Sequence, residues 1–223
     1  MSNGATQPSL KFESDLRDRG FSLIAGLDEV GRGTLAGPVV AAAVMLPAEL
    51  RPDATRLIRD SKQLSAQARL EAFACITELA LDSGIGACDS AEIDSMGIAN
   101  ATRLAMARAL EELDAPPDHL LIDALELPAL AIPQRSIIKG DSISYSIAAA
   151  SIVAKVTRDR LMAEVFEASF PGYGFAVHKG YGTRDHLAAL TELGPCLIHR
   201  RSFRPISDIL RGTAGQYGHS GSG

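Results

Sequence analysis

The sequence predicts an α/β domain in which helices flank a mixed central β-sheet. Three apolar segments with strand character come early in the chain, and segments with helical periodicity alternate with strands afterwards. The chain has 223 residues, of which 46% are hydrophobic and 22% charged, an ordinary composition for a globular protein. This length and composition suit one domain with a sizeable core.

Five strands are expected. Residues 21–28 and 38–46 form the first two, and the second is a nearly continuous Val/Ala run, which is typical of a strand buried on both faces. Shorter strands are expected at residues 84–88, at residues 119–122 and within residues 131–139.

Helices are expected between and after these strands, at residues 65–81, 90–113, 142–170 and 183–193. Ser65 is a plausible N-cap for the first of them, because its hydroxyl can accept a hydrogen bond from the first turn. A Gly-Pro pair closes the last helix.

The two ends of the chain differ in composition from the domain. Residues 1–9 are expected to form a disordered lead, and residues 212–223, rich in Gly and Ser, a flexible tail. Residues 10–211 form the domain, including a C-terminal helical segment from about residue 183. The N-terminus lacks an apolar signal region, and the longest apolar run, residues 39–46, is too short to span a membrane.

The cysteines indicate a reducing compartment. There are three of them, Cys75, Cys88 and Cys196, and no Cys-x-x-Cys motif occurs. An odd number without that motif disfavours both a disulfide framework and a zinc site. A cytoplasmic protein is therefore expected.

The charge of the chain is unevenly distributed. The net charge of −5 argues against a broadly basic coat for nucleic acid. Residues 178–204, however, contain five Lys or Arg residues and only two acidic ones. Such a basic patch on an acidic protein is compatible with nucleic-acid binding.

Adjacent carboxylates, Asp28 and Glu29, follow the first apolar strand. Like charges a few ångströms apart repel strongly where water is excluded, and a divalent cation between them would relieve that repulsion. Neighbours on a regular strand point to opposite faces, so both side chains can face one metal only if the strand breaks there. Otherwise Glu29 would contribute its backbone carbonyl.

Two further carboxylates stand at the ends of predicted elements. Asp123 ends the strand at residues 119–122, and Asp141 opens the helix at residues 142–170. Each has a plainer interpretation, as a turn former or as a helix cap. Together with the Asp28–Glu29 pair they favour one acidic centre, and oxygen ligands without Cys suit Mg²⁺ or Mn²⁺.

Several other charged residues have open interpretations. Arg158 and Asp159 are expected to form an ion pair on their helix. His186 and His199 suit a helix cap or the edge of the core, whereas His178 either contacts phosphate or has a similar structural role.

The chain resembles the type 2 ribonuclease H (ribonuclease HII) family. An ordered series of segments carries the resemblance: LDEVGRG at 27–33, LAGPV at 35–39, DSKQLS at 60–65, ID at 122–123, KGD at 139–141, IAAASIVAKV at 147–156, YGF at 173–175, HKGYGT at 178–183 and HRRSF at 199–203. The series covers most of the chain and is highly specific. Two positions depart from the family pattern, Thr34 in place of Pro and Ala124 in place of Gly.

The resemblance implies a fold, an activity and a metal centre. The fold would be ribonuclease H-like, and the enzyme would cleave the RNA strand of RNA–DNA hybrids and nick 5′ of single ribonucleotides in duplex DNA, as in ribonucleotide excision repair and DNA replication. Carried over residue by residue, the ligands of the divalent metal would be Asp28, Glu29, Asp123 and Asp141. No membrane and no obligate protein partner is implied, and a monomer is expected.

The resemblance also implies residues that contact the substrate. Gly31-Arg32-Gly33 and Tyr181 would recognise the junction between a ribonucleotide and a deoxyribonucleotide. Lys62 lies in a polar loop and is a candidate phosphate contact. Three residues of the basic window are further candidates: Lys179, Arg184 and Arg200.

Two alternative functions stay open from the residues alone. One is another metal-dependent nuclease or phosphatase of similar fold, and the other is a catalytically inactive hybrid-binding module. Metal-dependent cleavage of a duplex that contains one ribonucleotide would discriminate among the three.

Overall fold

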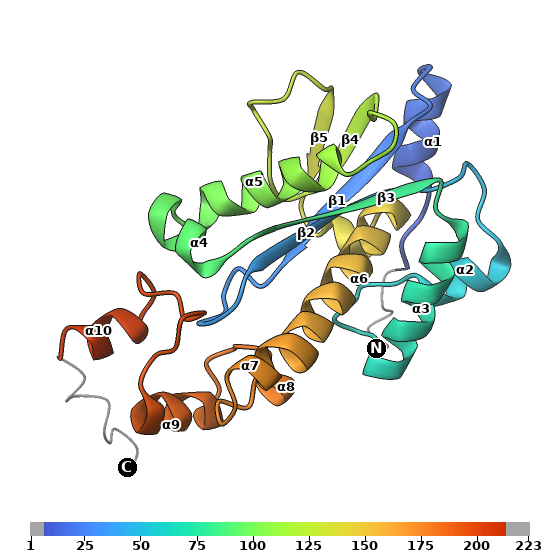
Figure 1. Cartoon of the computed structure of the whole chain (residues 1–223). Helices are drawn as coiled ribbons and strands as arrows, with labels where there is room; N and C mark the ends of the chain where they lie inside the picture. Colours follow the sequence, from blue (N-terminus) through green and yellow to red (C-terminus); the bar gives the residue numbers. More distant parts are fainter. Residues whose placement is uncertain (1–6, 213–223) are drawn as a thin grey trace, which may run out of the picture.

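A five-stranded mixed sheet with the strand order β3-β2-β1-β4-β5 forms the centre of the protein (Figure 1). The structure is a computed structural model that describes residues 7–212. Strands β1, β2 and β3 form an antiparallel meander, whereas β4 and β5 run parallel to β1. The strands are β1 (Ile24–Val30), β2 (Val39–Met45), β3 (Asp82–Cys88), β4 (His119–Asp123) and β5 (Gln134–Ile137). All five expected strands and the mixed sheet are confirmed.

Helices cover both faces of this sheet (Figure 1). The longer helices are α3 (Ala66–Leu79), α5 (Ile98–Glu111), α6 (Tyr145–Arg160) and α9 (Arg184–Leu193). Helices α3 and α6 share one apolar core with β2, and α5 shares a second core with the opposite face of β1, β2 and β4. The shorter helices are α1 (Lys11–Asp18), α2 (Pro52–Leu57), α4 (Ser90–Met96), α7 (Glu167–Ser169), α8 (Phe175–His178) and α10 (Ile206–Leu210).

Small side chains allow α6 to lie close to the sheet. Ala148, Ala149 and Ala150 are fully buried in the core between α6 and β2. A Cβ atom added to Gly26 on β1 would overlap the backbone of Ser146. This close packing fixes the start of α6 against β1, and with it the segment that precedes the helix.

Two predicted helices differ from the observed ones. The segment 90–113 is two helices, because Gly97 has a φ of 79° and ends α4 before α5 begins. The segment 142–170 begins with a 3₁₀ turn, η1 (Gly140–Ser142), and α6 starts only at Tyr145, where the Ser144 hydroxyl accepts a hydrogen bond from the Ile147 N–H. After α6 it continues as the π-helical turn η2 (Leu161–Phe166) and ends with the short helix α7.

The N-terminal residues that are described do not form a disordered lead. Ser9 pairs with Ser144 through an isolated β-bridge, and the Gln7 side chain donates to the Thr55 carbonyl at 2.7 Å. The prediction was therefore wrong for residues 7–9, because α1 buries Leu16 and Glu13 and holds the preceding chain against the domain. The predictions for residues 1–6 and 213–223 lie outside the described residues.

The C-terminal part packs on the end of α6 as a small helical module (Figure 1). Helices α8, α9 and α10 surround a core of their own that contains Phe175, Leu190, Ile206 and Leu35. Leu35 belongs to the loop between β1 and β2, so the module is attached directly to that loop. None of the helices in residues 7–212 is long and apolar enough to cross a membrane.

Candidate active site

Three structural elements bring the four predicted carboxylates to one edge of the sheet. Parallel pairing of Leu27 with Ile122 places Asp28 of β1 beside Asp123 at the end of β4. Asp141 lies in η1, where the Gly140 N–H donates to Asp123 Oδ1 at 2.7 Å. Such carboxyl ends of parallel strands are where α/β proteins place ligand sites.

Hydrogen bonds hold each aspartate in place. Asp28 Oδ1 accepts the Glu29 N–H at 2.7 Å, and Ser151 of α6 donates to the same carboxyl group. Asp141 Oδ2 accepts from Lys62 Nζ at 2.7 Å. Asp28 and Asp141 are only 4% and 3% exposed, so these contacts take the place of water.

The carboxyl groups disfavour one another's ionisation. Burial, followed by the charge of Glu29, raises the pKa of Asp28 well above its usual value. Burial likewise raises the pKa of Glu29, although Arg32 opposes the shift, and burial with the charge of Asp141 raises the pKa of Asp123. A centre of this kind favours binding of positive charge.

The strand does not break between Asp28 and Glu29. Both residues keep regular antiparallel pairing, with Ala42 and Ala41 respectively. Asp28 therefore lies on the face covered by α6, and Glu29 on the opposite face. The Glu29 carboxylate turns toward Arg32, whose Nη1 donates to Oε1 at 3.1 Å.

The donor chemistry of this centre fits a divalent cation. Its ligating atoms are oxygens, as Mg²⁺ and Mn²⁺ prefer. Glu29 Oε2 is buried and has no hydrogen-bond partner, and the ammonium group of Lys62 already lies against Asp141. In residues 7–212, no three acidic, His or Cys side chains are grouped closely enough to share one metal ion, so the carboxylates would have to converge on it.

The loop between β1 and β2 presents its backbone beside the acidic centre. Arg32 and Gly33 are exposed, and within the described part of the chain neither of their N–H groups forms a hydrogen bond. The Leu35 N–H donates to the Gly180 carbonyl at 2.8 Å, which places Tyr181 next to this loop. Tyr181 is 40% exposed, and Lys155 Nζ lies 5.7 Å from the centre of its ring.

The predicted phosphate contacts have different environments. Arg184 is exposed, and Lys62 is exposed but paired with Asp141. Lys179 is half-buried, and its ammonium group donates to the Ala176 carbonyl.

Arg200 is not a surface contact, which corrects the prediction made from its charge. It is fully buried, and its guanidinium donates to the carbonyls of Gly31, Arg32 and Gly37 at 2.6–3.1 Å. From this buried position, Arg200 stabilises the conformation of the loop between β1 and β2. The HRRSF segment that contains Arg200 packs against that loop. The clustering of basic residues in the sequence therefore did not mean that the Arg200 side chain is exposed.

His178 is also unavailable to phosphate. It is buried, its Nε2 donates to the Tyr173 carbonyl at 2.7 Å, and its Nδ1 accepts the Gly180 N–H at 3.1 Å. Both ring nitrogens are thus used within the module, which excludes the phosphate contact that was one interpretation of this residue.

His186 and His199 form a buried chain of hydrogen bonds behind Tyr181. The Tyr181 carbonyl can only accept, so His186 Nδ1 donates to it at 2.9 Å. His186 Nε2 must then accept from His199 Nε2 at 3.0 Å, and His199 Nδ1 accepts the Cys196 N–H at 2.9 Å. This chain requires both rings to be neutral, and burial lowers the pKa of each histidine to about 4.

Acidification should destabilise the protein through this histidine pair. The pKa of each ring is lower in the folded state than in the unfolded chain, so the unfolded chain binds more protons between about pH 6.5 and pH 4. Each histidine should remove on the order of 2 kcal/mol of the free energy of unfolding between pH 7 and pH 5. Urea unfolding at pH 7 and at pH 5 measures this change in the free energy of unfolding.

The variant His186→Asn isolates this effect, because the asparagine amide can still donate to Tyr181 but does not titrate. The carboxylates of the acidic centre shift in the opposite direction and are common to both proteins. Stability should therefore fall less in the variant than in the wild type. An identical fall in both would contradict a neutral histidine pair.

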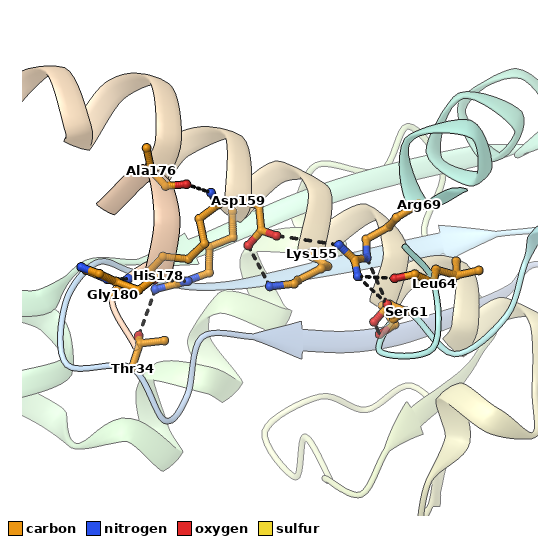
Figure 2. Close-up of polar contacts among 12 residues, drawn as sticks. Thr34, Ser61, Leu64, Arg69, Lys155, Asp159, Ala176, His178 and Gly180 are labelled. Carbon is orange, nitrogen blue, oxygen red and sulfur yellow. Dashed lines mark hydrogen bonds and ion pairs between the residues drawn. The ribbon is translucent and has the colours of Figure 1, made fainter. Parts of the chain in front are cut away.

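Ser61, Ser151 and Arg158 were not assigned to the site from the sequence. Ser151 bonds to Asp28, and its hydroxyl lies 2.9 Å from that of Ser61. The predicted ion pair of Arg158 with Asp159 is not formed in residues 7–212: Asp159 binds Lys155 at 2.8 Å and lies 4.0 Å from Arg69 (Figure 2). Arg158 is instead buried beside the loop of residues 31–38.

The fold and the site together define a class of protein. A mixed sheet of this order, carboxylates at the ends of adjacent strands and a neighbouring loop with free N–H groups are the features of a ribonuclease H-like phosphodiester hydrolase.

Comparisons with known proteins agree with this class. The sequence model of the family described as Ribonuclease HII matches residues 25–206. Ribonuclease HII of Dehalococcoides mccartyi (strain BAV1) is 51% identical over 92% of this chain and 96% of its own, and that of Geotalea uraniireducens is 53% identical over 92% and 94%.

Solved structures share the fold at lower identity. Ribonuclease H2 of Pyrococcus horikoshii superposes with a TM-score of 0.72 at 22% identity, over 86% of this chain and 99% of its own. Bst-RNase HIII in complex with Mn²⁺ gives 0.63 at 20% identity, over 87% and 71%. RNase HII of Archaeoglobus fulgidus, in a PCNA:RNase HII complex, gives 0.67 at 23% identity, over 80% and 92%.

The chain belongs to the ribonuclease HII family. It is therefore a ribonuclease H, an endonucleolytic hydrolase that acts on the RNA of RNA–DNA hybrids.

Proposed function

We propose that this enzyme nicks duplex DNA on the 5′ side of a single embedded ribonucleotide as well as cleaving continuous hybrids, and leaves 3′-hydroxyl and 5′-phosphate ends. One observation carries the proposal. The hydrogen bond from the Leu35 N–H to the Gly180 carbonyl holds Tyr181 beside the exposed backbone of Arg32 and Gly33. A ribose and the following deoxyribose can then be sensed together without contacts to the bases.

A divalent cation, Mg²⁺ or Mn²⁺, is the proposed cofactor. Asp28, Glu29, Asp123 and Asp141 would hold it, and Glu29 would bind through its unpartnered Oε2 or its backbone carbonyl. When bound, divalent cations supply an activated water and stabilise the leaving oxyanion of a phosphodiester. Because the centre has no free His or Lys base, the carboxylates themselves orient the attacking water.

The other polar groups would place the substrate. The free N–H groups of Arg32 and Gly33 can donate to a phosphate or to the 2′-hydroxyl, and the Tyr181 ring can pack on the neighbouring deoxyribose. Lys62, which is paired with Asp141, would contact a phosphate once a metal has replaced its ammonium group beside the carboxylate.

The decisive experiment uses a DNA duplex that contains one ribonucleotide. Cleavage is measured with Mg²⁺, with Mn²⁺ and with EDTA, and the ends of the products are determined. We expect one nick on the 5′ side with either metal and none with EDTA. Cleavage of only the continuous hybrid would contradict junction recognition, whereas metal-dependent binding without cleavage of either substrate would indicate a binding module.

We also propose that the enzyme acts as a monomer in the cytoplasm. All three cysteines are free thiols, which suits a reducing compartment. Sedimentation with and without a hybrid duplex would measure the oligomeric state, and a stable dimer would contradict it.

Binding of the hybrid should weaken steeply as salt rises, because phosphate contacts release counterions. The helical module would form the basic wall of the groove, with Arg184 and Lys179 as its phosphate contacts. We expect Arg184→Gln to make the slope of log K against log salt shallower by about 1. Titrations with Ca²⁺ over a salt series measure this slope.

Arg135→Gln is a suitable control for that titration, because Arg135 is exposed on β5 and lies over the Phe12 ring. It should leave the slope unchanged. An equally steep slope in the Arg184 variant would remove Arg184 from the groove, and a flat dependence in the wild-type protein would contradict an electrostatic groove altogether.

A further inference from the structure

Arg158 connects the two segments that lie on either side of the proposed junction site. From α6, its Nε donates to the Pro38 carbonyl at 2.9 Å, and its Nη2 donates to the Ala36 carbonyl at 3.0 Å. Its Nη1 donates to the Lys179 carbonyl at 2.9 Å, two residues before Tyr181. One rigid guanidinium therefore binds both the loop of residues 31–38 and the segment of Tyr181.

This side chain has no carboxylate partner in residues 7–212. Arg158 is fully buried and forms no ion pair there. Burial lowers its pKa to about 10, and smaller contributions from Tyr181 and Asp159 oppose this shift. Carbonyl and hydroxyl dipoles alone compensate its charge. A side chain without these donors would leave buried carbonyls of both segments unpaired, so the arginine favours one arrangement of the two segments.

Glycines bring the two segments into contact with Arg158 and with each other. A Cβ atom on Gly31, which has a φ of 89°, would overlap Arg158 Nε and would lie 2.8 Å from the Pro38 carbonyl. A Cβ atom on Gly180 would lie 2.5 Å from the Ala36 carbonyl. The segments therefore approach as closely as their backbones allow, and the guanidinium lies at their junction.

Thr34 completes the connection through its side chain. Its hydroxyl accepts from Arg158 Nη2 at 2.9 Å and has the Gly31 and Ala36 carbonyls within 3.0 and 3.1 Å. Figure 2 also shows the neighbouring contact of His178 with Gly180, on the Tyr181 side. Proline, usual in the family at this position, has no such hydroxyl, so this part of the connection depends on the residue this chain carries.

We propose that Arg158 is a positioning residue that sets the distance between the loop of residues 31–38 and Tyr181, and that this distance determines the preference for a ribonucleotide–deoxyribonucleotide junction. The inference rests on the proposed function of these two segments. It assigns Arg158 no contact with the substrate. A continuous hybrid, which presents ribose at every position of the RNA strand, should depend less on this distance.

The test compares two substrates in single-turnover cleavage. Arg158→Lys keeps the charge but cannot reach both segments, and Arg158→Met removes the donors. For each variant the rate on the lone-ribonucleotide duplex is divided by the rate on a continuous hybrid. We expect this ratio to fall by roughly tenfold in both variants, because small displacements of positioning groups have large effects on rate. Equal losses on both substrates would show a merely structural role.

Thr34→Val provides a second, milder variant if the arginine variants fold poorly. It retains the guanidinium and the shape of the side chain but removes the hydroxyl, so the ratio should fall by a smaller factor in the same direction. Thr34→Ser should restore the ratio of the wild type. An unchanged ratio in Thr34→Val, together with an unchanged ratio in a folded arginine variant, would overturn the proposal.

Arg17→Met is the matched control, because Arg17 is also a partly buried arginine that donates to a carbonyl, that of Leu46, on α1 far from the loop. It should leave the ratio unchanged. The single variants Arg158→Lys and Tyr181→Ala, compared with the wild type, separate the two hypotheses. If Tyr181→Ala alone lowers the ratio and Arg158→Lys does not, only the inference fails; if the wild-type protein does not cleave the lone-ribonucleotide duplex, the proposed function fails.

Discussion

Asp28→Asn should lose at least about a hundredfold in cleavage rate at saturating Mg²⁺, since even residues that only support metal ligands cost about 10–100-fold when replaced. Asp141→Asn should behave in the same way. Each change removes a charged oxygen ligand and keeps the size of the side chain. Circular dichroism of both variants should show a folded protein, and turnover near that of the wild type would remove the residue from the site.

The same Asp28→Asn variant should be more stable than the wild type in EDTA. The pKa of Asp28 is higher in the folded state than in the unfolded chain, so its ionisation at pH 7 destabilises the fold. Asparagine removes that contribution. Thermal unfolding in EDTA measures this difference in stability. The control is Asp15→Asn, at an exposed position, which should have the melting temperature of the wild type. A lower melting temperature would contradict a repulsive acidic centre.

Tyr181→Ala should lower cleavage of the lone-ribonucleotide duplex by roughly 10–100-fold, the range found when one aromatic stacking contact is removed. Its effect on a continuous hybrid should be much smaller, because the ring is proposed to pack only on the deoxyribose that follows the ribonucleotide. Single-turnover rates on the two substrates measure the difference.

Tyr181→Phe is the control for the ring itself, since it keeps the aromatic surface and loses only the hydroxyl. It should retain most of the preference. Equal losses of Tyr181→Ala on both substrates would show that Tyr181 is a general support of the module and that the junction is read elsewhere.

Periodicity and apolar runs predicted the sheet because a strand buried on both faces leaves a clear pattern. The Val/Ala run of β2 is such a pattern, and all its residues are buried. Local chemistry predicted the Ser65 cap, which accepts from the Ala68 N–H. The expected helix start at residue 142 was wrong, because Ser144 caps α6 and leaves Asp141 in the preceding 3₁₀ turn.

The roles of the arginines could not be predicted because a charged residue in a sequence indicates a solvated surface. Arg158 and Arg200 are fully buried, and they donate to carbonyls contributed by a loop more than a hundred positions away along the chain. Only the fold shows that those carbonyls point inward. The two departures from the family are also informative: Thr34 binds Arg158, and Ala124 adopts a φ of 49°, a conformation that favours glycine.

The pairing of β1 with β4 has a consequence for the order in which the protein assembles. β1 and β2 follow each other directly along the chain, and β2 and β3 are separated by α2 and α3, whereas β4 begins only at His119 and must dock beside Ile24. Pairing between residues that are distant in sequence forms more slowly than local pairing, because a longer loop must close. We therefore expect Asp28 and Asp123 to come together only when β4 docks, so that their repulsion arises in a late step of assembly.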